Sequence, residues 1–378
     1  MKFKIVMLAV ATVSTSSAYA GGMEVTRLPT EMMFEKGSHA SLSFGQFNPD
    51  VTGSIYADKN SMYKDRSAIT ATFKTQINDK ISLGFANYKS AEIQLDYTNA
   101  SASDFFISSS LPNPYVDLKI ETMAFLGRYQ MSESFSVIGG LKYTTGSGGG
   151  NVLISPAGII AAGEDSAIGG IFGISYEIPE IALRISGFYQ AKQEMSHKTN
   201  TTVTGPSIID LENTKSALPA SFTVDFQTGI AVDTLLYGSI HRALWDDAHI
   251  SFWSKAGALG GTDGLGTGEG YVQKTTWTDT TSLSLGIGRK LTDKWAISSS
   301  LNYEAPSEAA GTSLLSTTDG VRGITLGSKY SFDNMTITAG INYSQLGDKK
   351  VDPAGALPEG SFTNNSVTSF GLKLGYNF

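Results

Sequence analysis

The sequence contains no cysteine among its 378 residues. Disulfides and thiolate metal sites are therefore excluded, and packing and backbone hydrogen bonds must stabilise the fold. Charged residues are also scarce, at 17% of the chain, and the formal net charge is −7. A mildly acidic chain is a poor match for the phosphates of nucleic acid, so we expect no nucleic-acid partner.

Catalytic and metal-binding motifs are missing as well. The four histidines (His39, His197, His241 and His249) do not have the spacing of metal ligands. The glycine-rich stretch from Gly261 to Tyr271 does not link a buried strand to a helix, as a phosphate-binding loop would. No local motif supports a hydrolytic site around His241. We therefore predict neither a cofactor nor an enzymatic activity.

Long apolar runs are absent after the N-terminus. Residues 1–20 carry Lys2 and Lys4, an apolar run from Ile5 to Val13, and a small-x-small triplet from Ala18 to Ala20. This pattern predicts a secretory signal peptide that is cleaved before Gly21. No later stretch reaches the roughly 20 apolar residues of a transmembrane helix. A membrane protein without such a run is typical of a β-barrel, because lumen-facing polar residues interrupt every strand.

The clearest positive signal is alternation with a period of two. In the last stretch, TSFGLKLGYNF, apolar side chains occupy every second position from Phe370 to Phe378. Successive side chains of a strand point to opposite faces, so this segment has one apolar face and one polar face. A strand that ends the chain on an aromatic residue resembles the C-terminal strand of bacterial outer-membrane barrels.

The same alternation recurs along the chain and predicts about fourteen strands. Very short polar turns, such as Asn78 to Lys80 and Thr292 to Lys294, alternate with long irregular loops. An even number of strands with short turns at one end and long loops at the other is typical of outer-membrane barrels. We therefore predict an all-β protein with a membrane-spanning antiparallel β-barrel in residues 38–378 and a short N-terminal hatch in residues 21–37. Tyr and Trp near strand ends, including Trp245 and Trp295, are expected to form the interfacial girdles.

Charged residues on the other face of the strands should point into the lumen, since a charge in hydrocarbon is costly. They are Lys74, Arg128, Lys142, Glu177, Arg184, Asp225, Lys329 and Lys373. Two interpretations stay open for them. They form a positive lumen that meets an anionic head group, or they fill the interior as ion pairs with Glu177 and Asp225 as partners.

One predicted external loop is unusually apolar. It holds Phe105, Phe106, Ile107 and Leu111 between Asp104 and Asn113. Loops in water are normally polar, so such a cluster indicates either packing between loops or a site for an apolar ligand.

Two stretches resemble the FadL-type outer-membrane transporters of long-chain fatty acids and aromatic hydrocarbons. The stretch from Leu218 to Asp247 (LPASFTVDFQTGIAVD, then a strand ending in LWDD) is similar to the middle segment of that family. The stretch from Pro29 to Pro49 is similar to its entry into the first strand. The resemblance implies a monomeric barrel with a hatch in its lumen. It also implies a ligand that is captured between external loops, passes to an inner pocket and leaves sideways through a gap in the wall.

The resemblance also assigns residues to these steps. Phe105, Phe106, Ile107 and Leu111 would form the capture surface; Met32, Met33 and Phe34 would lie at the inner pocket; and Arg128, Lys142 or Arg184 would meet a carboxylate. The hatch is shorter than in the family, and the Asn-Pro-Ala that usually precedes the first strand is not evident. A kink that opens the wall is expected beside Gly173 or Gly238.

The function predicted from these features is passive uptake of long-chain fatty acids or related apolar molecules across the outer membrane of a Gram-negative bacterium. The alternatives are a general diffusion porin with an aqueous pore and a surface protein that adheres through its loops. The expected partners are the apolar ligand, outer-membrane lipid, and the barrel-assembly machinery through the C-terminal strand ending at Phe378.

Overall fold

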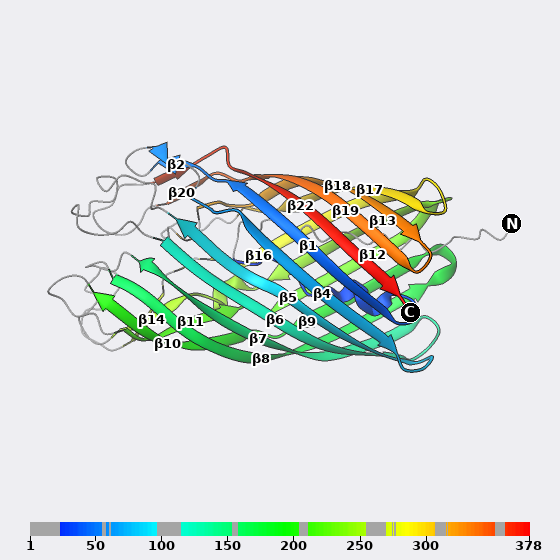
Figure 1. The fold of residues 1–378 in the computed structure, drawn as a ribbon, viewed down its shortest axis with the longest axis horizontal. Helices are drawn as coiled ribbons and strands as arrows, with labels where there is room; N and C mark the ends of the chain where they lie inside the picture. Colours follow the sequence, from blue (N-terminus) through cyan, green and yellow to red (C-terminus); the bar gives the residue numbers. More distant parts are fainter. Residues whose placement is uncertain are drawn as a thin grey trace.

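The computed structural model is a closed barrel with a short segment inside it (Figure 1). It describes residues 23–54, 58–59, 62–96, 115–152, 158–203, 211–254, 270–273, 275, 277–306, 315, 317–351 and 360–378. The C-terminus lies at the end of the barrel with the short turns, which we call the short-turn end; the opposite end is the long-loop end (Figure 1). The predicted signal peptide lies outside the described residues.

Fourteen antiparallel strands form the ring, which confirms the predicted fold class and strand number. They are β1 (His39–Asp50), β4 (Arg66–Gln76), β5 (Ile81–Asp96), β6 (Tyr115–Gln130), β7 (Phe135–Val152), β8 (Gly158–Ile178), β9 (Leu183–Gln190), β12 (Ser221–Ala231), β13 (Thr234–Ala243), β16 (Thr280–Lys290), β17 (Trp295–Glu304), β18 (Val321–Phe332), β19 (Met335–Leu346) and β22 (Ser366–Asn377). The ring closes where β22 pairs with β1, with Leu374 opposite Leu42. Closure leaves no open sheet edge between the first and last strands.

Shorter elements extend the barrel at the long-loop end. At this end, the start of β8 pairs with β10 (Gln193–Val203), and the wall continues through β11 (Leu211–Leu218), β14 (Ser251–Ser254) and β15 (Gly270–Gln273). A separate sheet joins β2 (Gly53–Ser54), β3 (Asp58–Lys59), β20 (Lys349–Val351) and β21 (Gly360–Phe362). Among the described residues, the 3-10 helices are η1 (Thr30–Phe34), η3 (Pro179–Ile181) and η4 (Trp245–Asp247). None of the described helices is long and apolar enough to span a membrane.

Local sequence sets the short turns. Asn78 Oδ1 accepts hydrogen bonds of 2.9 Å from the backbone amides of Lys80 and Ile81, which closes the turn between β4 and β5. Asp233 and Asp333 adopt positive φ angles of 55° and 46° in two further turns. Asp and Asn tolerate this left-handed conformation better than other side chains.

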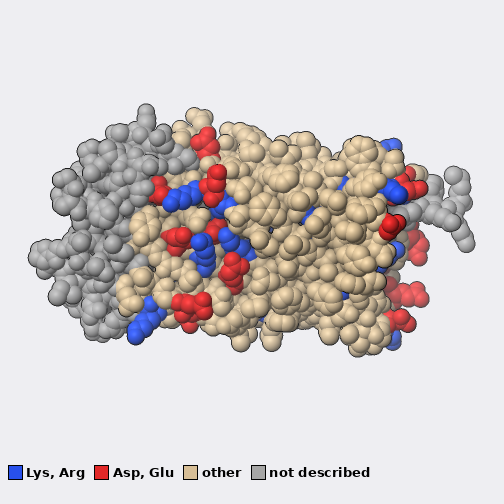
Figure 2. Space-filling view, in the orientation of Figure 1, with Lys and Arg blue, Asp and Glu red and all other residues tan. Residues whose placement is uncertain are grey.

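The outer and inner faces of the wall follow the alternation in the sequence. Outward side chains such as Leu42, Phe125 and Leu301 are exposed, and they form a belt largely free of charge between two charged ends (Figure 2). Lys74, Lys142 and Lys373 are buried on the inside, as predicted. An apolar belt around a closed barrel suits lipid hydrocarbon, so this surface spans a membrane.

Candidate functional site in the lumen

The hatch, residues 23–38 in the structure, lies inside the barrel and packs against one side of it. Its helix η1 contacts β4 and β5 (Figure 1). An apolar group that we call the hatch cluster contains Leu28, Met32, Met33, Ala86, Tyr88, Ala124, Leu126, Ile138, Ile171 and Phe188, with Phe34 at its edge. Gly84 makes the close packing possible, because a Cβ there would collide with the sulfur of Met33. Two of the residues assigned to the inner pocket, Met32 and Met33, are therefore buried between hatch and wall.

Two lumen cations hold Phe34 between them. The guanidinium of Arg128 lies 4.8 Å from the centre of the Phe34 ring, and that of Arg184 lies 4.2 Å from it. Arg128 also donates a hydrogen bond of 3.1 Å to the carbonyl of Met33 and forms an ion pair with Glu177. These contacts fix the end of η1 against β6 and β9, since a cation over an aromatic face is attractive.

Two lysines fasten the hatch from the other side. Lys74 Nζ donates hydrogen bonds to the carbonyls of Glu35 (2.6 Å) and Gly37 (2.9 Å). Lys373 Nζ lies 3.5 Å from a carboxylate oxygen of Glu31. The positive lumen near the short-turn end is thus largely engaged with the hatch.

A second apolar group lies inside the wall toward the long-loop end, and we call it the loop-end cluster. It contains Met23, Met62, Ala91, Ile93, Leu95, Leu118, Ile120, Met195, Ala217, Leu218, Ala243, Trp245, Ala248, Ile250, Trp277, Val351 and Phe362. The rings of Trp245 and Trp277 meet edge to face, with centroids 5.1 Å apart. Trp245 is only 2% exposed, so its assignment to an interfacial girdle is wrong. The chain leaves β13 at Ala243 and η4 turns Trp245 inward, whereas Trp295 is exposed on the outer face as expected.

A charged layer separates the two apolar clusters. A carboxylate oxygen of Glu24, in the hatch, lies 3.2 Å from Arg27 Nε and 3.6 Å from His241 Nε2. The Glu24 carboxylate also interacts electrostatically with the Lys142 ammonium. Burial acts to raise the pKa of the Glu24 carboxyl, but His241, Arg27 and Lys142 together hold it below the usual value. Tyr88 and Trp245 line the same small cavity, of about 30 Å³. Lys142, one of the predicted head-group cations, therefore borders both clusters.

The barrel wall is interrupted beside this layer. Strands β4 and β5 pair from Gln76↔Ser82 only as far as Thr70↔Tyr88. Beyond that point β5 carries a bulge at Ser90 in its pairing with β6 and diverges from β4. The predicted kink beside Gly173 or Gly238 is wrong, because both glycines remain paired with strands on either side.

Backbone of the hatch fills the gap between β4 and β5. Val25 N donates a hydrogen bond of 2.9 Å to the carbonyl of Ser90, and Glu92 N donates one of 2.9 Å to the carbonyl of Met23. Lys89 spans the gap, since its Nζ contacts both the carbonyl of Ser67 (2.8 Å) and the carboxylate of Glu92 (2.7 Å). This contact could not be predicted from local sequence patterns, because pairing between the hatch and β5 is long-range.

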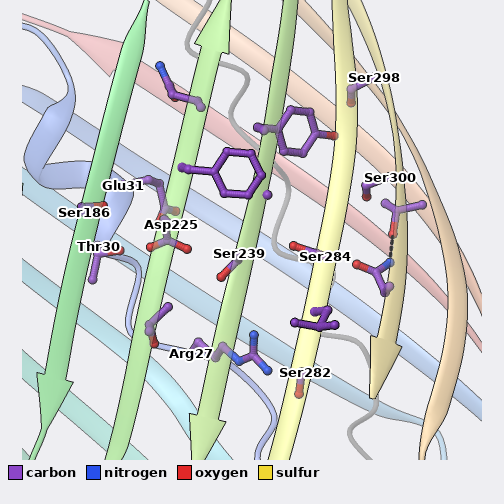
Figure 3. Close-up of a pocket in the computed structure, with 18 of the residues that line it drawn as sticks. Arg27, Thr30, Glu31, Ser186, Asp225, Ser239, Ser282, Ser284, Ser298 and Ser300 are labelled. Carbon is purple, nitrogen blue, oxygen red and sulfur yellow. Dashed lines mark hydrogen bonds between the residues drawn. The ribbon is translucent and has the colours of Figure 1, made fainter. Parts of the chain in front are cut away.

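A cavity of about 230 Å³, which we call the polar cavity after the hydroxyl groups of its facing wall, lies on the opposite side of the hatch (Figure 3). Arg27 and Glu31 of the hatch and Asp225 of β12 border it. The facing wall contributes hydroxyl groups, from Ser186, Ser239, Ser282, Ser284, Ser298 and Ser300. The hatch therefore packs against one side of the lumen and leaves a cavity open on the other side, which is lined by small polar side chains and also by Phe34, Phe188, Phe226 and Leu235.

The predicted capture residues (Phe105, Phe106, Ile107 and Leu111) lie outside the described residues, so their part in the site stays a prediction. The described residues contain no group of three or more His, Asp or Glu side chains that could hold a metal ion.

The same fold occurs in solved channel structures. A FadL homologue of Pseudomonas aeruginosa matches with a TM-score of 0.72 and 14% identity, over 97% of this chain and 98% of that one. The toluene transporter TodX of Pseudomonas putida matches with a TM-score of 0.67 and 14% identity, over 93% and 92% of the two chains. The monoaromatic hydrocarbon channel CymD matches with a TM-score of 0.62 and 15% identity, over 97% and 98%. No family model and no curated protein matches the sequence. The resemblance to FadL-type barrels is thus confirmed at the level of the fold.

Proposed function

We propose that this protein is a passive channel of the bacterial outer membrane that takes up hydrophobic small molecules. The observation that carries the proposal is the arrangement of an apolar cluster at the long-loop end directly beside an interruption of the wall, which the hatch fills in this structure. The solved structures with this fold include a toluene transporter and a monoaromatic hydrocarbon channel, which supports an apolar cargo.

The proposed path begins at the external loops. An apolar ligand leaves water on the surface formed by Phe105, Phe106, Ile107 and Leu111, and then enters the loop-end cluster around Trp245 and Trp277. Burial of apolar area supplies the driving force, at roughly 25 cal/mol per Å². The ligand next reaches the gap between β4 and β5, where the hatch strand from Met23 to Val25 must move to let it pass.

The finer proposal is that the ligand is a long-chain fatty acid. Arg128 and Arg184 already hold Phe34, whereas Lys142 borders the loop-end cluster. Lys142 is therefore the cation we assign to the carboxylate. Met32, Met33 and Phe34 lie below it, and we propose that they close the inner end of the pocket.

The experiment is uptake of labelled long-chain fatty acid by cells that lack their own transporter, with and without this protein. Uptake that depends on the protein, and that falls in a Phe105→Asp/Phe106→Asp variant, supports both the function and the capture surface. Absence of uptake in cells that display the folded barrel contradicts the proposal.

A diffusion porin is the second candidate, and the polar cavity beside the hatch favours it. Ser, Thr and Asn side chains line that cavity from β12 to β19, and a wall of this kind can solvate water and small polar solutes. Ion conductance across planar bilayers distinguishes this function from hydrophobic transport, since a path through apolar clusters passes no ions.

A further inference from the structure

The outward row of β6 changes from apolar to charged partway along the strand. Alternate residues of a strand share a face, and the outward positions from Tyr129 to Met123 are glycine or exposed aromatic and apolar residues. The next three outward positions, Glu121, Lys119 and Asp117, are charged. This change marks the limit of the lipid belt on the side of the long loops, where hydrocarbon gives way to head groups.

Neighbouring segments add to this charged end of β6. Gln94 of β5 pairs with Asp117, and Lys64, which precedes β4, reaches Asp96 at the end of β5. We call Lys64, Gln94, Asp96, Asp117, Lys119 and Glu121 the wall patch. Charged side chains of both signs gather on this face between the belt and the long-loop end (Figure 2). The wall patch therefore borders the surface that faces lipid.

The charged side chains of the wall patch are accessible from outside the barrel. Lys119 Nζ lies 3.5 Å from Asp117 Oδ2, and both side chains are 47% exposed. Lys64 Nζ lies 2.6 Å from Asp96 Oδ2 and also interacts electrostatically with Asp117, and the Lys64 side chain is 61% exposed. Glu121 is exposed and has no ion pair with another described residue. Exposed ion pairs contribute little to stability, so the lysines can exchange their partners for an external anion at little cost.

We propose that the wall patch binds the phosphorylated head group of a glycolipid in the outer leaflet. Lys64 and Lys119 pair with phosphate oxygens, and a divalent cation joins the phosphate to Glu121. The acyl chains lie along Met123 and Phe125, which are exposed just inside the belt. The long loops of outer-membrane barrels face the outside of the cell, which places the wall patch in that leaflet. This inference goes beyond the proposed function, because it concerns the lipid around the barrel and not the molecule that passes through it.

The mixture of charges fits this partner better than it fits a simple anion. The wall patch holds two lysines and three carboxylates, from Asp96, Asp117 and Glu121, so an anion alone meets repulsion. A divalent cation removes the repulsion, since Mg²⁺ commonly binds to one or two carboxylates together with phosphate oxygens. A phosphate monoester attracts a lysine more strongly than a carboxylate does, because it carries more than one negative charge and three acceptor oxygens.

Diphosphoryl and monophosphoryl lipid A, which differ by one phosphate, test the proposal on the purified protein in detergent. With Mg²⁺ present, we expect wild type to bind the diphosphoryl form more tightly, and EDTA should remove this preference. Lys64→Gln/Lys119→Gln should weaken binding of the diphosphoryl form by about 25-fold, at about fivefold for each lysine near a charged lipid surface. Glu121→Gln should leave a smaller preference that EDTA does not change.

Lys80→Gln/Lys294→Gln is the matched control. Both lysines are exposed in short turns at the opposite end of the barrel. This variant loses the same charge as the test variant, and it should bind both lipids as wild type does. The change in electrophoretic mobility on heating verifies that each variant is folded.

Three results overturn this inference. The first is equal affinity of wild type for the two lipids. The second is an equal loss of binding in the two double variants, because it would mean that net charge alone attracts the lipid. The third is a preference for the diphosphoryl form that persists in EDTA. Each of these results leaves the proposed function intact, since uptake of an apolar ligand does not use the wall patch.

Discussion

Val25 donates a backbone hydrogen bond of 2.9 Å to Ser90, at the place where β5 has lost its partner β4. This bond attaches the hatch to the wall as an added strand. An unpaired strand edge cannot face hydrocarbon without cost, because its polar groups find no water there. The hatch therefore stabilises the gap in the closed state, and its departure exposes the edge for as long as a ligand passes.

A disulfide between these two positions should block transport. Val25 and Ser90 lie opposite each other, since their neighbours Glu24 and Ala91 are paired, and opposed residues have Cα atoms within disulfide range. We expect Val25→Cys/Ser90→Cys to lose uptake of labelled fatty acid under oxidising conditions and to regain it with a reductant. Either single variant serves as the control. Uptake that continues in the oxidised double variant would show that the ligand leaves by another route.

Phe34→Ala should loosen the hatch without unfolding the barrel. The ring lies between Arg128 and Arg184, and each cation–π contact stabilises by about 0.5–2 kcal/mol. We expect hydrogen exchange at the amides of η1 to accelerate by roughly tenfold, which corresponds to a loss of about 1.4 kcal/mol in local stability. Phe332→Ala, at the short-turn end of β18, should leave that exchange unchanged. Exchange in η1 that stays at the wild-type rate would mean that the Met32 and Met33 contacts hold the hatch alone.

Ser300→Trp tests whether the polar cavity conducts. An indole at this position of β17 fills much of the space between the hatch and the facing wall. We expect any ion conductance of the purified protein in planar bilayers to fall in Ser300→Trp, while fatty-acid uptake by cells persists. Leu301→Trp, at the neighbouring position that faces outward, is the control. Loss of uptake together with conductance would place the apolar ligand in the polar cavity instead of the gap.

Phe378→Ser should slow assembly of the barrel. The Phe378 ring is 70% exposed and meets Tyr376 edge to face with centroids 5.0 Å apart, so it stands at the outer rim of the closing strand. We expect a smaller folded fraction in the outer membrane, measured by the change in electrophoretic mobility on heating, and a matched Phe332→Ser variant should assemble better. Equal assembly of the two variants would argue against a special role for the terminal aromatic residue.

The barrel itself could be predicted from the sequence because the alternation of apolar and polar residues that produces it is a local pattern. Alternation at every second residue places Phe370 and Leu374 outside and Lys373 inside, and each strand repeats this rule without reference to its neighbours. Charge then decides the inner face, which is why Lys74 and Lys142 were placed in the lumen from their positions alone.

The gap in the wall could not be predicted in the same way. The segment Lys89-Ser90-Ala91 has the residue pattern of an ordinary strand. The loss of its pairing with β4 depends on a bulge and on a hatch more than sixty residues away in the chain. The inward turn of Trp245 was missed for a related reason. A tryptophan at a strand end is compatible with an interfacial girdle and with the lumen, and η4 is what directs Trp245 inward.

On the proposed path, an apolar ligand crosses the barrel through the loop-end cluster. The most direct test of this path is uptake of labelled long-chain fatty acid by cells that carry Trp245→Ala or Trp295→Ala in place of the wild-type protein, at equal amounts of folded barrel. Both variants remove an indole, from the lumen in one and from the outer face in the other. We predict that Trp245→Ala loses most of the uptake and that Trp295→Ala retains it. Equal uptake by the two variants would contradict the claim.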